Sequence, residues 1–383
     1  MRILGIETSC DETAVCLIEA SGAFGTDFRY EIIGNALHSQ IATHAPWGGV
    51  FPNLAKREHA KHLVPLLEQV LPQPQTPRGL TSGGTAGLEE LLAREPELLE
   101  MLQEFLKTHD RPDIDAIAVT HGPGLAPALW VGVNFARALS TLWQIPLIAV
   151  NHLEGHIIMA AMDVGHRMSH MREVAFPALA LLISGGHTEI DLIESWPRFT
   201  LIGQTRDDAV GEAFDKVARM LGIPYPGGAE LSRMASVARA RNETPEFKLP
   251  RPMMHDDGFD FSFSGLKTAV LRLVDKRELS AQEKEAVALE FENAASDVLV
   301  AKTKRAAEEH NAQTLLVGGG VSANEFIKTR LAEALDIPVF APPPELATDN
   351  ALMIALAGYF HALQGEFVDP NQLRADGNLK LGS

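Results

Sequence analysis

Short apolar segments alternate along this chain with longer stretches in which apolar residues recur at every third or fourth position. Short apolar runs are typical of buried β-strands, and the longer periodicity is typical of amphipathic helices. The predicted strands are Ile3–Ile6, Ala14–Ile18, Ile114–Val119, Leu147–Val150, 178–183, 188–193 and Thr314–Val317. The predicted helices are 53–71, a segment after the Gly122-Pro123-Gly124 turn, 208–221, 281–309 and about 350–363. This alternation predicts an α/β fold in which helices cover sheets.

Three segments interrupt the alternation. Residues 73–87 are rich in residues that break helices and strands, which predicts an exposed insertion. The following stretch, 88–106, has the spacing of an acidic amphipathic helix, and we expect it to decorate the surface with its charged face in solvent. Residues 163–173 predict another loop insertion, with His166 and His170 in solvent.

An internal repeat divides the chain in two. Residues Ile6–Glu19 align with Leu181–Glu194 at a constant offset of 175 positions (181 minus 6). Each copy predicts a strand, a tight polar turn and a second strand, and each half later contains an apolar strand that runs into glycines. We therefore expect two related domains facing one cleft, at 1–174 and 175–383, with an insertion at about 73–112 in the first. The closing helix is a candidate to pack back on the first domain.

The turns of the two copies predict different chemistry. Ser184-Gly185-Gly186-His187-Thr188 combines two glycines with hydroxyl groups, which suits the close approach of a phosphate or carboxylate. A plain glycine hairpin is the alternative. The first copy, Ser9-Cys10-Asp11-Glu12, carries carboxylates, which near a phosphate would steer a nucleophile or bind a bridging cation. A role for Asp11 as a cap of its own turn is the alternative.

A third glycine segment, Gly318-Gly319-Gly320-Val321-Ser322-Ala323-Asn324, lies between a predicted strand and a predicted helix. Small residues before a helix N-terminus suit an adenine nucleotide, and we expect Ser322 to be the N-cap. The segment matches neither the GxGxxG fingerprint nor the GxxxxGK[ST] phosphate loop. Dehydrogenases and phosphate-loop NTPases are therefore excluded.

His152-Leu153-Glu154-Gly155-His156 places two imidazoles four residues apart, on one face if the segment is helical. Two ordinary helix-terminal histidines are the alternative. The segment is not the HExxH of a metalloprotease, because Glu154 projects away from the shared face. Among carboxylates of the second domain, Asp349 is the best placed third ligand, and two histidines with one carboxylate suit Fe²⁺ or Zn²⁺.

Two further segments carry candidate binding residues. Asp215 lies on a predicted amphipathic helix, where it is a candidate acceptor for ribose hydroxyls. A salt bridge from Asp215 to Lys216 or Arg219 is the alternative. Phe261 and Phe263 are expected to belong to the core rather than to stack on bases.

Composition and charge narrow the function. The 383 residues are 46% hydrophobic, which is enough for two packed domains and excludes a disordered or fibrous protein. The net charge of −17 opposes general affinity for phosphate backbones, so a nucleic-acid substrate would need a local basic patch or a helper protein. Two cysteines make no disulfide framework, and no apolar run has the length of a signal peptide or membrane span. We expect a cytoplasmic protein with no membrane contact.

Taken together, these motifs resemble the TsaD family of tRNA N6-adenosine threonylcarbamoyltransferases, formerly described as O-sialoglycoprotein endopeptidases. The matching segments are GIETSCDET at 5–13, GGVFPNLAKREH at 48–59, GPGL at 122–125, NHLEGH at 151–156, SGGHT at 184–188, GEAFDKVARMLGIPYPGG at 211–228, FSFSGLKT at 261–268, GGGVSAN at 318–324 and TDNALMIA at 348–355. The resemblance runs in order from residue 1 to about 363. It departs from the family at 73–112, at 163–173, and at Asn53 and Ala60-Lys61.

The resemblance implies an actin-like ATPase or sugar-kinase-like (ASKHA) fold, with two duplicated domains around a nucleotide cleft. It implies one divalent metal per subunit, with Fe²⁺ favoured over Zn²⁺, held by His152, His156 and Asp349. It also implies that threonylcarbamoyl-adenylate binds to Leu182, Ile183, Ser184, Gly185, Gly186, Asp215, Gly228 and Asn324. Family members act on tRNA with a smaller, metal-less TsaB-like paralogue and a TsaE-like ATPase.

The residues and the resemblance together predict metal-dependent acyl transfer. The adenosine N6 amine next to the anticodon would attack the threonylcarbamoyl carbonyl in tRNAs that read codons starting with A, and AMP would leave. Asp11 and Glu12 are the candidate catalytic residues for deprotonating that amine. A small-molecule carbamoyltransferase or kinase on the same fold is the alternative, although a kinase has no need for the His152, His156 and Asp349 trio.

Overall fold

The computed structural model describes all residues except 72–86, 165–168, 276–277 and 383. Within the described residues, seven strands form sheet A in the order β5-β4-β1-β2-β3-β7-β6. They are β1 (Arg2–Glu7), β2 (Glu12–Ser21), β3 (Arg29–Ser39), β4 (Ala116–Gly122), β5 (Leu147–Asn151), β6 (Met162–Asp163) and β7 (Ser169–Met171). Strand β1 pairs antiparallel with β2 and parallel with β4, and β2 pairs antiparallel with β3.

Sheet B repeats this topology. Its described strands follow the order β10-β9-β8-β11-β12. They are β8 (Ala178–Ile183), β9 (Thr188–Ser195), β10 (Arg198–Gln204), β11 (Thr314–Gly318) and β12 (Val339–Phe340). Because β8 pairs antiparallel with β9 and parallel with β11, it occupies in sheet B the position that β1 occupies in sheet A.

The register of the two hairpins is also the same. Ile6 pairs with Val15 across β1 and β2, and Leu181 pairs with Ile190 across β8 and β9. Both partners are related by the offset of 175 found in the sequence (181 minus 6 and 190 minus 15). The predicted α/β fold built from a duplicated unit is confirmed.

The helices of the described residues fill the connections between strands. The α-helices are α1 (Ile41–His44), α2 (Pro52–Val70), α3 (Leu88–Leu91), α4 (Pro96–Leu106), α5 (Ala126–Trp143), α6 (His152–Ala161), α7 (Val210–Met220), α8 (Gly228–Ala240), α9 (Ser264–Val274), α10 (Ala281–Glu309), α11 (Glu325–Ala334) and α12 (Ala351–Gln364). Short 3-10 helices span Ala45–Trp47, Gly320–Ala323 and Pro344–Leu346.

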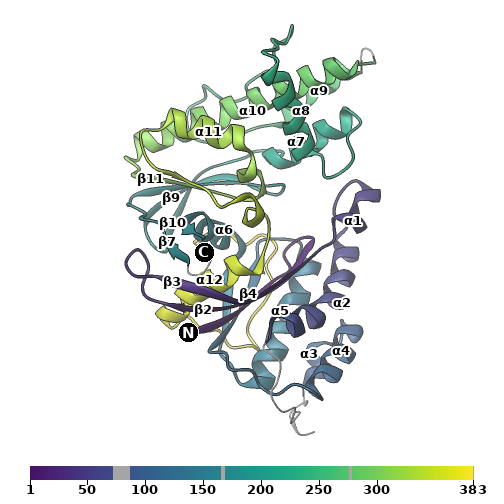
Figure 1. The fold of residues 1–383 in the computed structure, drawn as a ribbon, viewed down its shortest axis with the longest axis vertical. Coiled ribbons are helices and arrows are strands. Elements are labelled where there is room, and N and C mark those ends of the chain that lie inside the picture. The colour runs from purple at the N-terminus through teal and green to yellow at the C-terminus, as the bar shows by residue number, and fades with distance from the viewer. Residues whose placement is uncertain (72–86, 165–168, 276–277, 383) are drawn as a thin grey trace.

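Figure 1 shows the helices in three groups, with α2 to α5 outside sheet A, α7 to α11 outside sheet B, and α6 and α12 between the sheets. Successive residues of a strand point to opposite faces, so each sheet contributes to two cores. In β1, Ile3 belongs to the core between the sheets and Leu4 to the core under α2 and α5. In β8, Leu182 belongs to the core between the sheets and Leu181 to the core under α7 and α10. Helix α12 packs against β1, β2 and β4, although it follows sheet B in the chain.

The strands and helices with the clearest periodicity have nearly the predicted bounds. Strand β8 and helix α10 match them, and α2 begins one residue early. Strands β3 and β10 and helix α8 were not predicted. Strand β3 leaves Ile32, Ile33 and Leu37 exposed, so its apolar residues do not alternate as in a half-buried strand.

The expectation that 88–106 is an amphipathic surface helix is confirmed for its charged face, which is exposed at Glu89, Glu90, Glu97, Glu100 and Glu104, but one continuous helix is wrong. The segment forms two helices, α3 and α4, and the Leu98 and Leu102 side chains are fully buried in the core shared with α2 and α5. Glu95 is also buried and pairs with Lys56 of α2, with Nζ and Oε1 3.0 Å apart. The stripe of leucines on α4 packs against α2, while Glu97, Glu100 and Glu104 on its other face remain exposed.

The interpretation of 163–173 as a loop is also wrong. Strands β6 and β7 pair with each other, and β7 extends sheet A beyond β3 through the Tyr30–Ser169 pair. His170 is exposed as expected and pairs with Asp163, with Nε2 and Oδ2 3.4 Å apart. His166 and most of the predicted insertion at 73–87 lie outside the described residues.

Two smaller expectations have opposite outcomes. Phe261 and Phe263 are fully buried in the core, as predicted. Ser322 is not an N-cap, because it lies inside the 3-10 helix Gly320–Ala323, and the cap of α11 is Asn324, whose Oδ1 accepts the amide hydrogen of Ile327. The extra 3-10 turn moves the start of α11 two residues further along the chain than the sequence indicated.

Among the described residues, no helix is both long enough and apolar enough to cross a membrane.

Candidate metal and substrate site

Helix α6 presents two histidines on one face. Asn151 caps its N-terminus by accepting the Leu153 amide hydrogen at 2.9 Å, which fixes His152 as the first helical residue. His156 follows one turn later, and the two ring centroids lie 4.7 Å apart in an edge-to-face arrangement. Both side chains are buried. The predicted helical pair of imidazoles is confirmed.

Asp349 reaches these histidines from the segment before α12. Asn350 caps α12 by accepting the Met353 amide hydrogen at 3.1 Å, and its own amide group donates to the Thr348 carbonyl at 2.8 Å. These bonds fix the backbone on both sides of Asp349. Its Oδ1 lies 3.1 Å from His156 Nε2 and 3.4 Å from His152 Nε2. The structure therefore brings together the three residues that the sequence proposed as ligands.

The spacing of these atoms fits a single ion. Zinc bonds to nitrogen and oxygen of about 2.0–2.1 Å in a tetrahedral arrangement place neighbouring ligand atoms about 3.4 Å apart. The two measured separations from Asp349 Oδ1 have this size, and the three ligand atoms all lie within 4.8 Å of one another. The donor set also suits Fe²⁺, so geometry does not select between the two ions.

Glu7 orients His152 from the opposite side, and the sequence analysis missed it. Its Oε2 lies 3.2 Å from His152 Nδ1 and accepts the Thr120 hydroxyl hydrogen at 2.6 Å. Ser9 Oγ also lies 3.2 Å from His152 Nδ1. A buried carboxylate on the outer nitrogen of a ligand histidine fixes the ring and raises its basicity. The signal in the sequence was an acid at the end of a fully apolar strand.

The electrostatics of the triad reflect a site built for positive charge. Burial alone would lower the pKa of His152, but the carboxylates of Asp349 and Glu7 outweigh it and raise that pKa well above its ordinary value. Burial would raise the pKa of Asp349, but His152 and His156 outweigh it and hold that pKa well below its ordinary value. A proton on His152 thus occupies the place that a cation would take.

Glu154 lies between the two histidines in the chain but points elsewhere, as predicted. Its Oε2 lies 2.9 Å from His361 Nε2 of α12. Together with Glu366, Glu154 raises the pKa of His361 to about 9, although burial alone would lower it. This pair joins α6 to α12. It also keeps the Glu154 carboxylate away from His152, His156 and Asp349.

The turn that carries Asp11 and Glu12 is supported by a histidine of α2 that the sequence analysis did not single out. His59 of α2 is fully buried, with Nε2 3.0 Å from the Cys10 carbonyl and Nδ1 2.8 Å from Thr13 Oγ1. Burial lowers the pKa of His59 to about 4, so the ring is neutral at pH 7. It braces the turn that carries Asp11 and Glu12.

Asp11 and Glu12 face the other lobe. Burial, Asp349 and Asp11 together raise the pKa of Glu12 to about 9. The charge of Asp11 also contributes to the raised pKa values of Tyr225 and Asp215, after the larger effect of burial. Because the charge of Asp11 affects the pKa values of Tyr225 and Asp215, the turn that carries Asp11 lies near the segment that contains these two residues.

The glycine turn between β8 and β9 has room for a ligand. A side chain at Gly185 or Gly186 would meet no atom within 4 Å. The amide hydrogens of Gly186 and His187 are donated to Ser184 Oγ at 3.2 and 3.0 Å. Burial, followed by the neighbouring His152 and His156, lowers the pKa of His187 to about 4, which places this turn beside the triad. An anion would therefore find open space beside a compact turn that Ser184 Oγ holds together.

Two other glycines allow helices to approach the turn closely. A side chain at Gly211 of α7 would lie 2.6 Å from the Ser184 carbonyl oxygen. A side chain at Gly319 would lie 2.5 Å from the Ile183 carbonyl oxygen, and Gly319 has a φ of +85° that favours glycine. The predicted turn and the predicted glycine run therefore form one structural unit.

Asp215, Gly228 and Asn324 converge on the start of α8. Asp215 Oδ1 accepts the amide hydrogens of Gly227 and Gly228, both at 2.9 Å. Asn324 donates to Ser232, one turn along α8, at 2.9 Å. The alternative of a salt bridge from Asp215 to Lys216 or Arg219 is not seen among the described residues. Lys216 instead pairs with Asp208 and Glu212, and Arg219 donates to the Gly48 carbonyl.

Comparison with known proteins identifies the family. The family model of TsaD, tRNA N6-adenosine threonylcarbamoyltransferase, matches residues 31–77 and 94–356. The chain belongs to the TsaD family. A TsaD relative from Nitrosospira multiformis is 40% identical over 96% of this chain and 92% of its own length. Another from Bacillus cereus is 42% identical over 95% of this chain and 92% of its own length, and both carry the name of the family enzyme.

Solved structures support the fold of this TsaD chain. Full-length HypF in a phosphate- and nucleotide-bound form has a TM-score of 0.50 at 13% identity, over 95% of this chain and 55% of that one. The likeness agrees with the expected ASKHA fold. The relatives do not favour the alternative of a small-molecule carbamoyltransferase or kinase.

Proposed function

We propose that this chain transfers the threonylcarbamoyl group from threonylcarbamoyl-adenylate to N6 of the adenosine 3′ of the anticodon, releasing AMP. The substrates would be tRNAs that read codons starting with A. Membership of the TsaD family supports the activity. The observation that carries the proposal in this chain is the meeting of His152, His156 and Asp349 beside the glycine turn.

His152, His156 and Asp349 would hold one divalent metal, Fe²⁺ or Zn²⁺. When bound, the metal would supply a Lewis acid that orients and polarises the carbonyl group of the donor. The donor atoms, their spacing and the buried Glu7 carboxylate behind His152 support this assignment. The metal would also replace the proton that His152 otherwise holds, so binding would release it.

The remaining residues would bind and position the two substrates. Residues 182–186 and the start of α8, with Asp215, Gly228 and Asn324, would hold the adenylate. The open space at Gly185 and Gly186 would let an anionic phosphate come close to the main chain of this turn. Asp11, on the facing turn, would accept the proton of the attacking amine, and Glu12, which its pKa of about 9 keeps protonated at pH 7, would orient that amine.

Charge bears on how tRNA is recognised. The net charge of −17 opposes unaided binding to a polyanion. We propose that a smaller TsaB-like paralogue and a TsaE-like ATPase complete the tRNA-binding surface. Tight tRNA binding by the isolated chain at moderate salt would contradict this part of the proposal.

The test is mass spectrometry of tRNA nucleosides after incubation with threonine, bicarbonate, ATP and the companion proteins. The chain should produce threonylcarbamoyladenosine, and His156→Ala should not. His170→Ala is the matched control, because His170 also pairs with an aspartate but is exposed on the edge hairpin. Transfer to a small acceptor in place of tRNA would overturn the proposal.

A further inference from the structure

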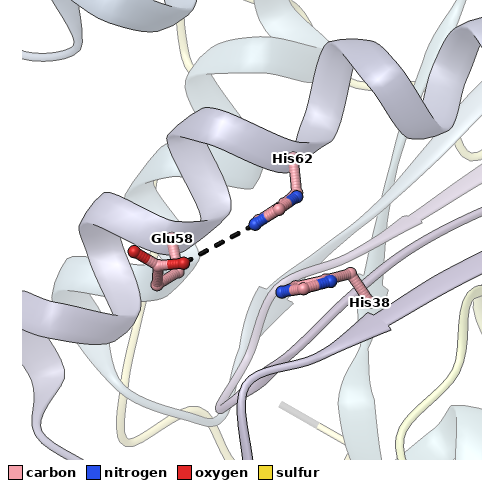
Figure 2. Close-up of side chains that lie close together, drawn as sticks. All are labelled: His38, Glu58 and His62. Atoms are coloured by element: carbon pink, nitrogen blue, oxygen red, sulfur yellow. Dashed lines mark ion pairs between the residues drawn. The ribbon is translucent and has the colours of Figure 1, made fainter. Parts of the chain in front are cut away.

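A second group of metal-ligating side chains lies away from the triad, on the outer side of sheet A. His38 comes from β3, and Glu58 and His62 come from α2 (Figure 2). Each residue offers a ligand atom, and these atoms lie within 4.8 Å of one another. All three residues are half-buried. Glu58 lies in the segment 48–59 of the sequence analysis, but His38 and His62 lie in none of its motifs.

We propose that His38, Glu58 and His62 form a second divalent-metal site, for an ion such as Zn²⁺ that accepts imidazole nitrogen and carboxylate oxygen together. Two histidines and one glutamate are a donor set for zinc, and three protein ligands leave a position open to solvent. The site requires no tRNA, so it stands independently of the proposed transferase activity.

The local structure explains how the three residues meet. Glu58 and His62 lie one helical turn apart, on the side of α2 away from the buried Leu63 and Leu67. His38 pairs with Thr13 near the end of β3, and α2 packs on this strand. Two rigid elements therefore supply the ligands, as an ordered site requires.

The distances suit an ion between these groups. His62 Nε2 lies 3.5 Å from Glu58 Oε2, close to the spacing of about 3.4 Å expected for two neighbouring zinc ligands. The rings of His38 and His62 are stacked, with centroids 3.6 Å apart and planes 20° apart. Figure 2 shows that each ring has a nitrogen on the side of Glu58, and because imidazole binds a metal in the plane of its ring, one of the stacked rings would turn for one ion to contact both.

Lys61 is the competing partner of the carboxylate. Its Nζ lies 2.7 Å from Glu58 Oε1, on a side chain that is half exposed. The pair uses the oxygen that does not face His62, so Glu58 can contact Lys61 and an ion at the same time. If the cluster were only a surface ion-pair network, Lys61 would strengthen it. If the cluster binds a metal, the positive charge of Lys61 would weaken binding.

The site would fasten α2 to β3. His59 lies on the same turn of α2 and supports the Cys10 carbonyl in the acidic turn. An ion bound to His38, Glu58 and His62 would therefore stiffen the part of the chain that carries this support.

The first test is calorimetric titration of the full chain, stripped of metal by a chelator, with ZnCl₂ alone. We expect two equivalents of Zn²⁺ for the parent and one for His38→Gln/His62→Gln. His152→Ala/His156→Ala should also retain one, which separates this site from the triad. His170→Gln is the control for loss of an exposed histidine. Unchanged stoichiometry in His38→Gln/His62→Gln, with thermal unfolding like that of the parent, would overturn the proposal.

The second test uses the sign of the lysine effect. Lys61→Met should increase the Zn²⁺ affinity of this site by about two- to fivefold, the scale of one exposed charge pair. Lys107→Met is the matched control, because Lys107 forms the same i,i+3 pair with Glu104 on α4. Weaker zinc binding in Lys61→Met would contradict the site.

Discussion

The hairpin turns of the two sheets have the same architecture and opposite chemistry. In sheet A the turn contains Asp11 and Glu12, rests on His59, and lies next to the Glu7 carboxylate at the end of β1. In sheet B the equivalent turn contains Gly185 and Gly186, with open space where side chains would be. The duplication preserved strand order and register, and the turns diverged. One turn carries two carboxyl groups, and the other has open space in their place.

The triad depends on both halves of this comparison. His152 takes its orientation from Glu7 in sheet A, while Gly318 at the end of β11 lets sheet B approach His156, since a side chain there would lie 3.1 Å from His156 Cβ. Changes in the acidic half should therefore affect metal binding, and changes in the glycine half should affect the donor substrate.

Removing the ligand that joins the halves should have the greatest effect. Asp349→Ala should lower kcat/KM by about three orders of magnitude, since polarisation by a metal supplies several kcal/mol and each factor of ten is about 1.4 kcal/mol. The measurement is threonylcarbamoyladenosine formation, with bound metal determined in parallel. Full activity in a chain that retains no metal would contradict the role of the triad.

Glu7 tests the support of the triad from the acidic half. Glu7→Gln replaces the charged acceptor beside His152 Nδ1 with a neutral one, and loss of such an outer carboxylate lowers metal affinity by about 10- to 100-fold. Competition with a chelator measures this loss. Thr120→Val is the companion variant, because it removes one hydrogen bond to Glu7 and leaves the carboxylate. Equal affinities in the parent and Glu7→Gln would show that Glu7 serves only the fold.

The glycine half gives a contrast between two glycines. Gly186→Ala should raise KM for the adenylate by about tenfold, roughly 1.4 kcal/mol, with unchanged unfolding, because the new methyl group enters open space that the ligand would use. Gly319→Ala should instead destabilise the fold by at least about 1–3 kcal/mol, because its φ of +85° with ψ of 161° suits only glycine and the new Cβ would lie 2.5 Å from the Ile183 carbonyl oxygen. Kinetics and urea unfolding of both variants separate space for a ligand from backbone strain. Normal KM in Gly186→Ala would argue against the turn as a binding site.

Whether a feature of the two halves could be predicted from the sequence depends on how far apart along the chain its interacting residues lie. The two hairpins were predictable because each is local and its strands are continuous apolar runs. The link between the histidines and Asp349 was correct, although it spans the two sheets. Glu7 was missed because its partners, Thr120 and His152, lie far along the chain, and only the pairing of β1 with β4 brings them near. The acid at the end of an apolar strand was visible in the sequence, but its partners were not.

The irregular parts were predicted least well for a related reason. The leucines of α4 are buried by α2, and the edge hairpin β6–β7 exists because β3 offers an open edge. Both depend on surfaces that form only after the sheet assembles, so tertiary packing decides them and local periodicity does not.

A position inside the strands completes the comparison. Asp191 of β9 corresponds to Cys16 of β2 (191 minus 175), and both are fully buried. Neither carboxylate oxygen of Asp191 has a hydrogen-bond partner among the described residues, and burial, together with Glu189, raises its pKa to about 8. The folded state thus favours the neutral acid, whereas the unfolded chain ionises near pH 4. The free energy of unfolding of the parent should therefore fall, through the titration of Asp191, as pH rises from about 4 to about 8.

Asp191→Cys gives β9 the side chain of its counterpart and removes this cost. We expect the variant to be more stable than the parent by about 1 kcal/mol at pH 8, the lower end of the cost of an unpaired buried polar group, and by less at pH 5. Urea unfolding at both pH values measures the difference, and Asp260→Cys is the control because Asp260 is bonded to Arg206. The Asp191→Cys advantage must grow with pH. If the stability difference were the same at both pH values, the pKa of Asp191 would not differ between the folded and unfolded states. The replacement of a buried carboxyl group by a thiol would then account for the whole difference.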